Sequence, residues 1–312
     1  MATEPIVSTL DLRMAGRTGV GASSILSDYW ALTKPEVNFL IVISTFAGFY
    51  LGSATGWQDF PYLRAINAVL GTLLVASGTG TLNQYIERDF DAQMRRTARR
   101  PLAAGRLNPT AVLWFGIALS VLGTAHLALA VNLLASLLAL ATLLSYLFLY
   151  TPLKRRTPLC TLVGAFPGAM PPLIGWAAAS GRLNFETWIL YAVLFLWQFP
   201  HFMSIAWMYR EDYERAGYQV LPRGSQARLS LVNRQTLLPL LALLTLSMVP
   251  VLIDRPTLYG IGAVLLTLTF FYCGAQFVTR RSASTARRLL AASIVYLPAL
   301  LVLMVITRAS RI

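Results

Sequence analysis

Nine long apolar blocks follow one another along the 312-residue chain, separated by short polar segments. Each block is close to the about 20 residues that a helix needs to cross roughly 30 Å of hydrocarbon. None of them shows the strict alternation of apolar and polar residues that is typical of membrane barrel strands. The pattern predicts an all-α polytopic membrane bundle of about nine transmembrane helices, at residues 37–54, 65–86, 111–128, 132–150, 159–179, 187–209, 236–253, 257–278 and 289–306.

The composition agrees with a membrane protein and excludes a soluble domain. Only 12% of the residues are charged and 56% are hydrophobic, whereas soluble domains carry about 25% charged residues. Residues 1–27 lack the apolar core of a cleavable signal peptide. We interpret them as a disordered cytoplasmic N-terminal tail, with a short organelle transit peptide as the alternative. Residues 28–312 are then a single nine-helix transmembrane domain.

The net charge of +13 is distributed unevenly between the loops. If successive loops alternate between two sides and the N-terminus lies inside, most of the 26 Lys and Arg residues fall on the inside. Cytoplasmic loops carry this kind of excess. The sequence therefore predicts a multi-pass protein of a bacterial cell inner membrane, with a cytoplasmic N-terminus and a periplasmic C-terminus. Because topology explains the basic residues, we expect the lipid bilayer as a partner and no nucleic acid.

Acidic residues gather after the second and sixth apolar blocks. Asn83, Glu87 and Asp91 are spaced by four residues, so on a helix they share one face. Amide and carboxylate oxygens suit Mg²⁺, which is usually shared with substrate phosphates. Asp212 follows the sixth block at an equivalent place. We predict that these four residues are catalytic and hold Mg²⁺.

Basic residues stand close to both acidic groups. Arginine and lysine side chains suit the oxygens of a diphosphate, and the candidates are Arg88, Arg95, Arg99, Lys154 and Arg155. Arg95 and Arg99 fall on one face if the helix continues past the acids. Such a site would draw charge from a leaving diphosphate at a membrane face. The alternative is a solvated helix end, where acids and arginines simply pair.

Four segments carry a resemblance to a known family. They are TKPEV at residues 33–37, NQYIERDFDAQMRRTARRPL at 83–102, YTPLKRRTPLCTLVGAFPGAMPPLIGW at 150–176 and WQFPHFMSIAWMYREDYERAGYQVLP at 197–222. They resemble the intramembrane prenyltransferases of the UbiA superfamily, and within it the protohaem IX farnesyltransferase (haem O synthase) branch. The resemblance covers about residues 28–306.

This resemblance implies a fold, an activity and partners. It implies nine helices around a central cavity, with Mg²⁺ as the cofactor. It also implies transfer of a farnesyl group from farnesyl diphosphate to the 2-vinyl group of haem B, giving haem O, with haem B as a substrate rather than a bound cofactor. The product would feed terminal-oxidase assembly, so haem A synthase or oxidase assembly factors are further expected partners.

The sequence departs from the superfamily pattern at two positions. Glu87 stands where many members have aspartate, and Ala216 stands four residues after Asp212, where many relatives have a second aspartate. Haem O synthases share this reduced second motif, so it favours that branch over enzymes that prenylate quinone precursors. It leaves open how a second Mg²⁺ would be held.

Two alternatives to this function remain, as do two interpretations of His201. A prenyltransferase acting on a quinone-precursor or chlorin acceptor would use the same chemistry. A transporter of an anionic lipid is a different class, but it needs substrate groups near the middle of the bilayer, whereas the charged residues cluster at the inside interface. His201 in the sixth block is a candidate catalytic residue that could ligate haem iron or contact the diphosphate. A hydrogen-bonded core histidine is the other interpretation.

Overall fold

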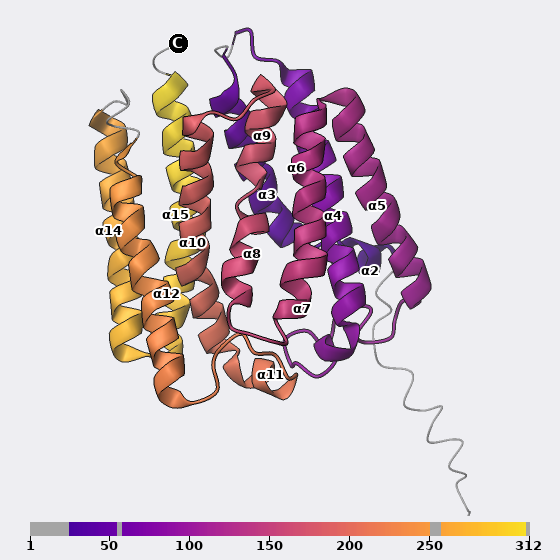
Figure 1. The fold of residues 1–312 in the computed structure, drawn as a ribbon, viewed down its shortest axis with the longest axis vertical. Coiled ribbons are helices and arrows are strands. Elements are labelled where there is room, and N and C mark those ends of the chain that lie inside the picture. Colours follow the sequence, from indigo (N-terminus) through magenta and orange to yellow (C-terminus); the bar gives the residue numbers. More distant parts are fainter. Residues whose placement is uncertain (1–24, 55–57, 250–256, 310–312) are drawn as a thin grey trace, which may run out of the picture.

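The computed structural model describes residues 25–54, 58–249 and 257–309, and these fold into a bundle of helices running side by side (Figure 1). Nine helical segments of the described residues are long and apolar enough to cross a membrane. The predicted all-α multi-pass architecture is therefore confirmed. The helices are α2 (Ile25–Leu32), α3 (Pro35–Gly52), α4 (Tyr62–Asp91), α5 (Pro109–Ala130), α6 (Leu133–Leu144), η1 (Ser145–Tyr150), α7 (Thr151–Leu153), α8 (Cys160–Gly168), α9 (Pro171–Ser180), α10 (Phe185–Met208), α11 (Arg210–Arg215), α12 (Ser225–Leu246), α14 (Thr257–Arg280) and α15 (Ala283–Ala309).

The spans form two groups that meet along α10 and α15. Helices α3, α4, α5, α6 and α9 pack together on one side, and α10, α12, α14 and α15 pack on the other. Helix α15 also returns to α3, where Arg308 donates hydrogen bonds to the carbonyls of Tyr50 and Ser53 at the end of α3. A cation at a helix C-terminus is favourable, so this contact stabilises the pairing of the first and last spans.

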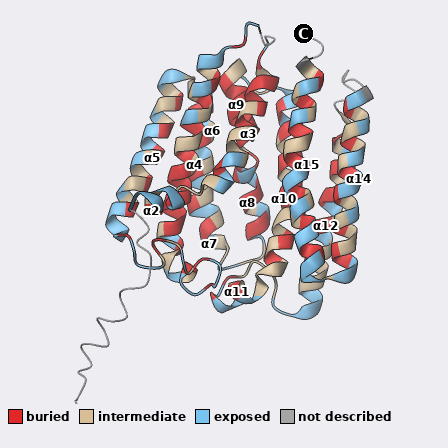
Figure 2. Cartoon of the chain, turned by 180° about the vertical axis from the view of Figure 1, so that it is seen from behind, coloured by how far each residue is buried: buried red, intermediate tan, exposed pale blue. Residues whose placement is uncertain are grey.

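Exposed residues lie along the outward sides of the helices (Figure 2), and many of them are large and apolar. Large exposed examples are Trp114, Leu129, Phe148, Leu265 and Val302. A water-soluble protein rarely leaves so much contiguous apolar surface uncovered. This surface is the one that a lipid environment would cover.

Small residues allow α4 and α5 to approach each other closely. Gly71 and Gly78 on α4 face α5, and Gly116 and Gly123 on α5 face α4, so that any added Cβ at these positions meets the opposite helix. Helix interfaces in membranes depend on such small residues, because lipid tails give no hydrophobic drive for association. Close packing against α5 therefore helps to hold α4, whose C-terminal end carries the acidic residues, in place.

The seventh span differs from its prediction. It was expected at residues 236–253 after a loop at 210–235, but α12 begins at Ser225. Arg228 and Arg234 make the first turns of α12 polar, so a search for apolar blocks does not include these turns in the span. Arg228 pairs with Glu214 at 2.6 Å. The prediction of the start was wrong because a helix can extend beyond the hydrocarbon. Residues 250–256 lie outside the described residues.

The predicted N-terminal tail is described only in part. Residues 1–24 lie outside the described residues, and α2 begins at Ile25, inside the segment 1–27. Helix α2 crosses beside α4 and α5 rather than running along the bundle axis (Figure 2). It leads directly into the first span through Thr33 and Lys34.

Candidate active site

Three of the predicted site residues share one buried face at the end of α4. The helix continues to Asp91, so Asn83, Glu87 and Asp91 stack on successive turns, as their spacing predicts. Their exposed fractions are 1%, 5% and 1%. Burying two carboxylates in this way is costly unless each is paired. The contacts around them are therefore the core of the site.

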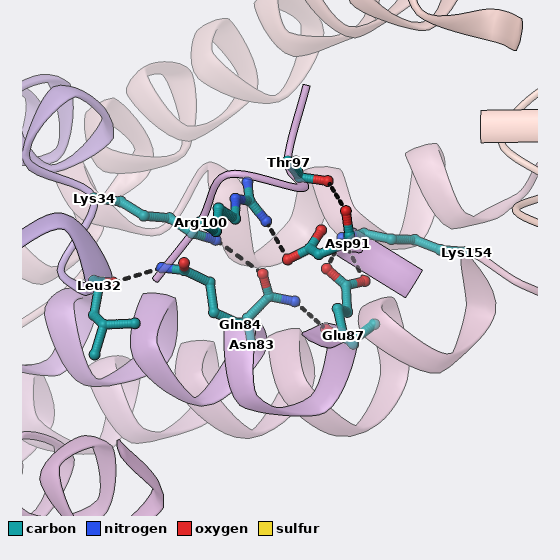
Figure 3. Close-up of polar contacts among 10 residues, drawn as sticks. Leu32, Lys34, Asn83, Gln84, Glu87, Asp91, Thr97, Arg100 and Lys154 are labelled. Atoms are coloured by element: carbon teal, nitrogen blue, oxygen red, sulfur yellow. Dashed lines mark hydrogen bonds and ion pairs between the residues drawn. The ribbon is translucent and has the colours of Figure 1, made fainter. Parts of the chain in front are cut away.

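Each of the three residues is contacted by a basic side chain from a different segment (Figure 3). Lys154 Nζ lies 2.9 Å from Glu87 Oε1 and 3.1 Å from Oε2. The Arg100 Nη1 atom lies 2.6 Å from Asp91 Oδ2, and Lys34 Nζ donates to Asn83 Oδ1 at 2.8 Å. The result is a cluster of alternating positive and negative charges at one end of the bundle.

An irregular end to the fourth span positions Lys154. Residues Ser145–Tyr150 form a π-helical segment, and Pro152, which lacks a backbone N–H, follows at once. Thr151, the first residue of α7, donates to the carbonyl of Tyr146 at 2.9 Å and accepts from Asn83 Nδ2 at 3.2 Å. Short π-helical segments are frequent at functional sites. Here the segment ties the base of the fourth span to α4 and directs Lys154 toward Glu87.

Lys34 and Arg100 are site residues that the sequence prediction missed. Lys34 has a positive φ of 53°, which is uncommon for a residue other than glycine, and it occupies the turn between α2 and α3. Burial, and then the nearby charges of Arg100 and Lys154, lower the pKa of Lys34 to about 7, against the opposing effect of Glu87 and Asp91. Only its place in the TKPEV segment could have signalled this role.

The pKa of Lys154 shifts in the opposite direction to that of Lys34. Burial alone would lower its pKa, but the Glu87 carboxylate and nearby tyrosines raise the pKa well above its ordinary value. A lysine in direct contact with a buried carboxylate stays charged. Lys154 is therefore a permanent cation of the site, whereas Lys34 is a titratable one.

The loop after α4 does not continue the helix. The backbone of residues 92–105 forms successive turns, and the Thr97 hydroxyl donates to the Asp91 carbonyl at 2.8 Å. Arg95 and Arg99 therefore do not share a helical face, which corrects that expectation, and both side chains are exposed. Instead, the turns direct Arg100 back to Asp91.

Asp212 lies where the sixth span ends and α11 begins. It is buried, and it accepts from the backbone N–H of Arg96 at 3.3 Å and pairs with Arg215 at 3.0 Å. The segment after α11 also reaches the site, since Gln219 donates its backbone N–H to the Lys154 carbonyl at 2.7 Å. The two acidic loops and the Lys154 loop thus meet at one end of the bundle.

Two other predicted diphosphate ligands lie outside the cluster in this structure. Arg88 donates to the Tyr85 carbonyl at 2.8 Å and lies 3.7 Å from Asp89. Arg155 stacks on the Phe90 ring, 4.2 Å from its centroid. Among the described residues, neither side chain pairs with Glu87, Asp91 or Asp212.

His201 belongs to a separate polar group between α10 and α15. Its Nδ1 lies 2.8 Å from Ser293 Oγ, and its ring stacks on Trp197 with centroids 4.9 Å apart. Ser293 Oγ donates to the Leu290 carbonyl at 2.6 Å, so toward the imidazole it acts as an acceptor. We therefore assign the proton to Nδ1, which leaves the lone pair on Nε2.

The residues of α4 fit a magnesium ion shared with a diphosphate. Among the described residues, no three acidic, histidine or cysteine side chains converge on one metal position. Mg²⁺ at a phosphate site needs only one or two carboxylates, because phosphate oxygens and waters complete its shell. Asn83, Glu87 and Asp91 supply hard oxygens on one face, and their present Lys and Arg partners are groups that suit phosphate equally well.

Comparison with known proteins identifies the family. Residues 41–297 match the UbiA prenyltransferase family. The chain belongs to the UbiA prenyltransferase family. It is 49% identical over 290 residues to the protoheme IX farnesyltransferase of Solibacter usitatus, covering 91% of this chain and 99% of that protein. The predicted resemblance to the protohaem IX farnesyltransferases and the predicted enzyme class, a prenyltransferase, are both confirmed.

Solved structures of the UbiA family share the fold. A digeranylgeranylglyceryl phosphate synthase aligns with a TM-score of 0.70 at 17% identity, covering 92% of this chain and 99% of that one. A UbiA homologue from Archaeoglobus fulgidus, bound to GPP and Mg²⁺, aligns with a TM-score of 0.62 at 16% identity, covering 86% of this chain and 99% of that one. At these identities the likeness establishes the architecture of the bundle.

Proposed function

We propose that this UbiA-family prenyltransferase transfers a farnesyl group from farnesyl diphosphate to the 2-vinyl group of haem B, forming haem O. The observation that carries the proposal is the charge cluster on α4, where Asn83, Glu87 and Asp91 meet Lys34, Lys154 and Arg100. Such a cluster suits a diphosphate and its magnesium ion. The acceptor is taken from the relatives, which are named protoheme IX farnesyltransferases.

The residues of the cluster divide into two roles. Asn83, Glu87 and Asp91 would hold Mg²⁺, with Asp212 completing the acidic side, and the ion would offset the negative charge of the diphosphate. Lys154 and Arg100 turn from the carboxylates to the diphosphate oxygens, and the charged form of Lys34 joins them. Further cations that a diphosphate would attract lie on α4 and in the loops after α4 and α7, namely Arg88, Arg95, Arg99 and Arg155.

The chemistry that follows needs one water molecule and no oxidant. The allylic C–O bond of the prenyl diphosphate breaks, and its electron pair leaves with the diphosphate. The vinyl π electrons of haem B form the new C–C bond to the allylic cation, which moves the positive charge to the carbon beside the porphyrin ring. Water adds there and loses a proton, giving a hydroxyethylfarnesyl group. The enzyme accelerates the first step by stabilising the charge that develops on the diphosphate.

His201 is proposed as the contact to the haem. Its Nδ1–H is held by Ser293, and Nε2 keeps its lone pair. Metal-binding histidines in proteins are oriented in this way through their second nitrogen. An axial bond from Nε2 would fix the porphyrin against α10, away from the charged end of α4.

The decisive test of the acceptor uses purified protein with haem B, farnesyl diphosphate and Mg²⁺. We expect haem whose mass has increased by one farnesyl group and one hydroxyl group, and no product when the metal is chelated. A matched reaction contains 4-hydroxybenzoate in place of haem. Prenylation of that acid with no haem product would assign the enzyme to the quinone-precursor class, and prenylation of a chlorin supplied in place of haem would assign it to the chlorin class.

We also propose that the charge-rich loops face the cytoplasm of a bacterial cell, with the C-terminus in the periplasm. The basic excess on the loops after α4, α7 and α10 supports this orientation. Cysteines introduced as Ala104→Cys and Arg311→Cys should react with a membrane-impermeant reagent from opposite sides. Labelling of both from one side of intact cells or inverted vesicles would contradict the nine-span topology.

A further inference from the structure

Helix α2 carries a row of large apolar side chains that no described part of the protein covers. Ile25, Leu26 and Trp30 are 72%, 79% and 65% exposed. Leu26 and Trp30, four residues apart, share one face, whereas Ile25 is exposed at the N-terminal end in line with Tyr29 and Leu32. On that second side Leu32 is fully covered, and Tyr29 packs edge-on against Phe115 with 5.0 Å between the ring centroids. One side of the helix thus faces the bundle, and no described residue covers Leu26 and Trp30 on the other.

Both ends of α2 are fixed to positions near the inside boundary of the membrane. At its C-terminal end, Gln84 of α4 donates to the Leu32 carbonyl at 2.9 Å. Near its N-terminal end, Asp28 accepts hydrogen bonds from Arg106 at 2.8 and 3.0 Å. Arg106 stands in the loop that leads into α5, so both attachments belong to the same end of the bundle.

The length of α4 sets the depth of the first attachment. Arg64 near its start and Gln84 enclose a stretch without any charged residue. At 1.5 Å per residue that stretch is roughly 30 Å long, which equals the thickness of the hydrocarbon. Gln84 therefore lies at the inside edge of the hydrocarbon, and Glu87 and Asp91 lie beyond it. A helix attached there and running across the bundle lies along the boundary.

From these observations we infer that α2 is an interfacial helix whose Leu26 and Trp30 side chains insert into the inside leaflet of the bilayer. Amphipathic helices lie in the interface with their apolar face immersed among the headgroups and upper acyl chains, and tryptophan prefers this layer. The occupant of the free face is the lipid surface, because α2 leads through Thr33 and Lys34 into the first membrane span.

The position of α2 bears directly on the charge cluster. Lys34 follows α2 by two residues, and its Nζ contacts Asn83. A helix held in the leaflet thereby fixes the lysine at the level where a lipid-borne diphosphate headgroup would arrive. This inference concerns the membrane surface, so it stands or falls independently of the group that is transferred.

The test measures immersion of single nitroxide labels on the full chain, with both native cysteines replaced by alanine. Labels are placed through Leu26→Cys and Trp30→Cys in vesicles of phosphatidylcholine and phosphatidylglycerol. A control label at Val121→Cys, exposed on α5, represents a lipid-facing position, and one at Glu211→Cys, exposed on α11, represents a water-facing position. We expect oxygen to collide with labels 26 and 30 more than with label 211, and a water-soluble nickel chelate to collide less.

Two outcomes would overturn the inference. Labels 26 and 30 that meet the nickel chelate as often as label 211 would place α2 in water. Labels shielded from both reagents would show that protein covers the face, either the N-terminal residues or a second copy of the chain. A far-ultraviolet circular dichroism spectrum equal to that of the unlabelled protein establishes that each variant is folded.

Discussion

Replacing Asp91 by alanine should abolish prenyl transfer while haem affinity stays near that of the wild type. Asp91 is buried and pairs with Arg100 at 2.6 Å, and it is proposed as a metal ligand at the diphosphate. Loss of this proposed metal ligand and of its negative charge should slow the ionisation of the allylic C–O bond. We expect a decrease in kcat of about 10³-fold or more, which corresponds to roughly 4 kcal/mol of lost transition-state stabilisation. Single-turnover kinetics and haem titration would separate the two effects.

Asp89→Ala is the matched control for this experiment. It removes the same charge two residues away, but the Asp89 side chain is 75% exposed and lies 3.7 Å from Arg88. Exposed pairs of this kind contribute about 0–1 kcal/mol, so turnover should stay close to the wild type. Asp91→Glu keeps the charge and should retain a little activity. If Asp91→Ala still forms product at the normal rate, the motif is only a solvated helix end.

Much of the bundle could be predicted because the bilayer imposes strong rules on sequence. A span must be long, apolar and helical, so the nine apolar blocks of the sequence correspond to nine candidate spans among the described residues. The start of α12 escaped prediction because its first turns carry Arg228 and Arg234 and extend beyond the hydrocarbon. Hydropathy locates the membrane rather than the ends of a helix.

Within the site, too, the local arrangement could be predicted and the long-range contacts could not. Asn83, Glu87 and Asp91 could be placed together, because four-residue spacing on a helix is a local rule. The identity of the cation at Asp91 was not predictable, since it depends on how the turns after α4 direct Arg100 rather than Arg95 or Arg99. Long-range contacts of this kind are set by the tertiary structure.

Lys34 is the clearest example of a site residue that could not be predicted from the sequence. It lies 49 residues before Asn83, and nothing in the spacing of the chain links the two. The link comes from the left-handed turn at Lys34 and from the attachment of α2 to α4. Such a turn in a residue other than glycine persists only when the surrounding structure fixes it, so it is visible in the structure alone.

Lys154→Met should abolish turnover and also destabilise the protein. The substitution keeps most of the side-chain volume but leaves the buried Glu87 carboxylate without its cation, which lies at 2.9 Å in the wild type. Removing one partner of a buried pair costs about 3–5 kcal/mol. A lower midpoint of thermal unfolding, together with weaker binding of farnesyl diphosphate, would reveal the two losses.

A double variant separates stability from catalysis at this pair. Glu87→Gln combined with Lys154→Met removes both charges, so most of the lost stability should return, while activity stays absent because a metal ligand and a diphosphate cation are both missing. Arg156→Met is the control, since it removes a positive charge from an exposed position in the same loop. Unfolding midpoints of the single and double variants form a cycle that measures the coupling directly. Active Lys154→Met protein, or a double variant as unstable as the single one, would contradict the proposed role of the pair.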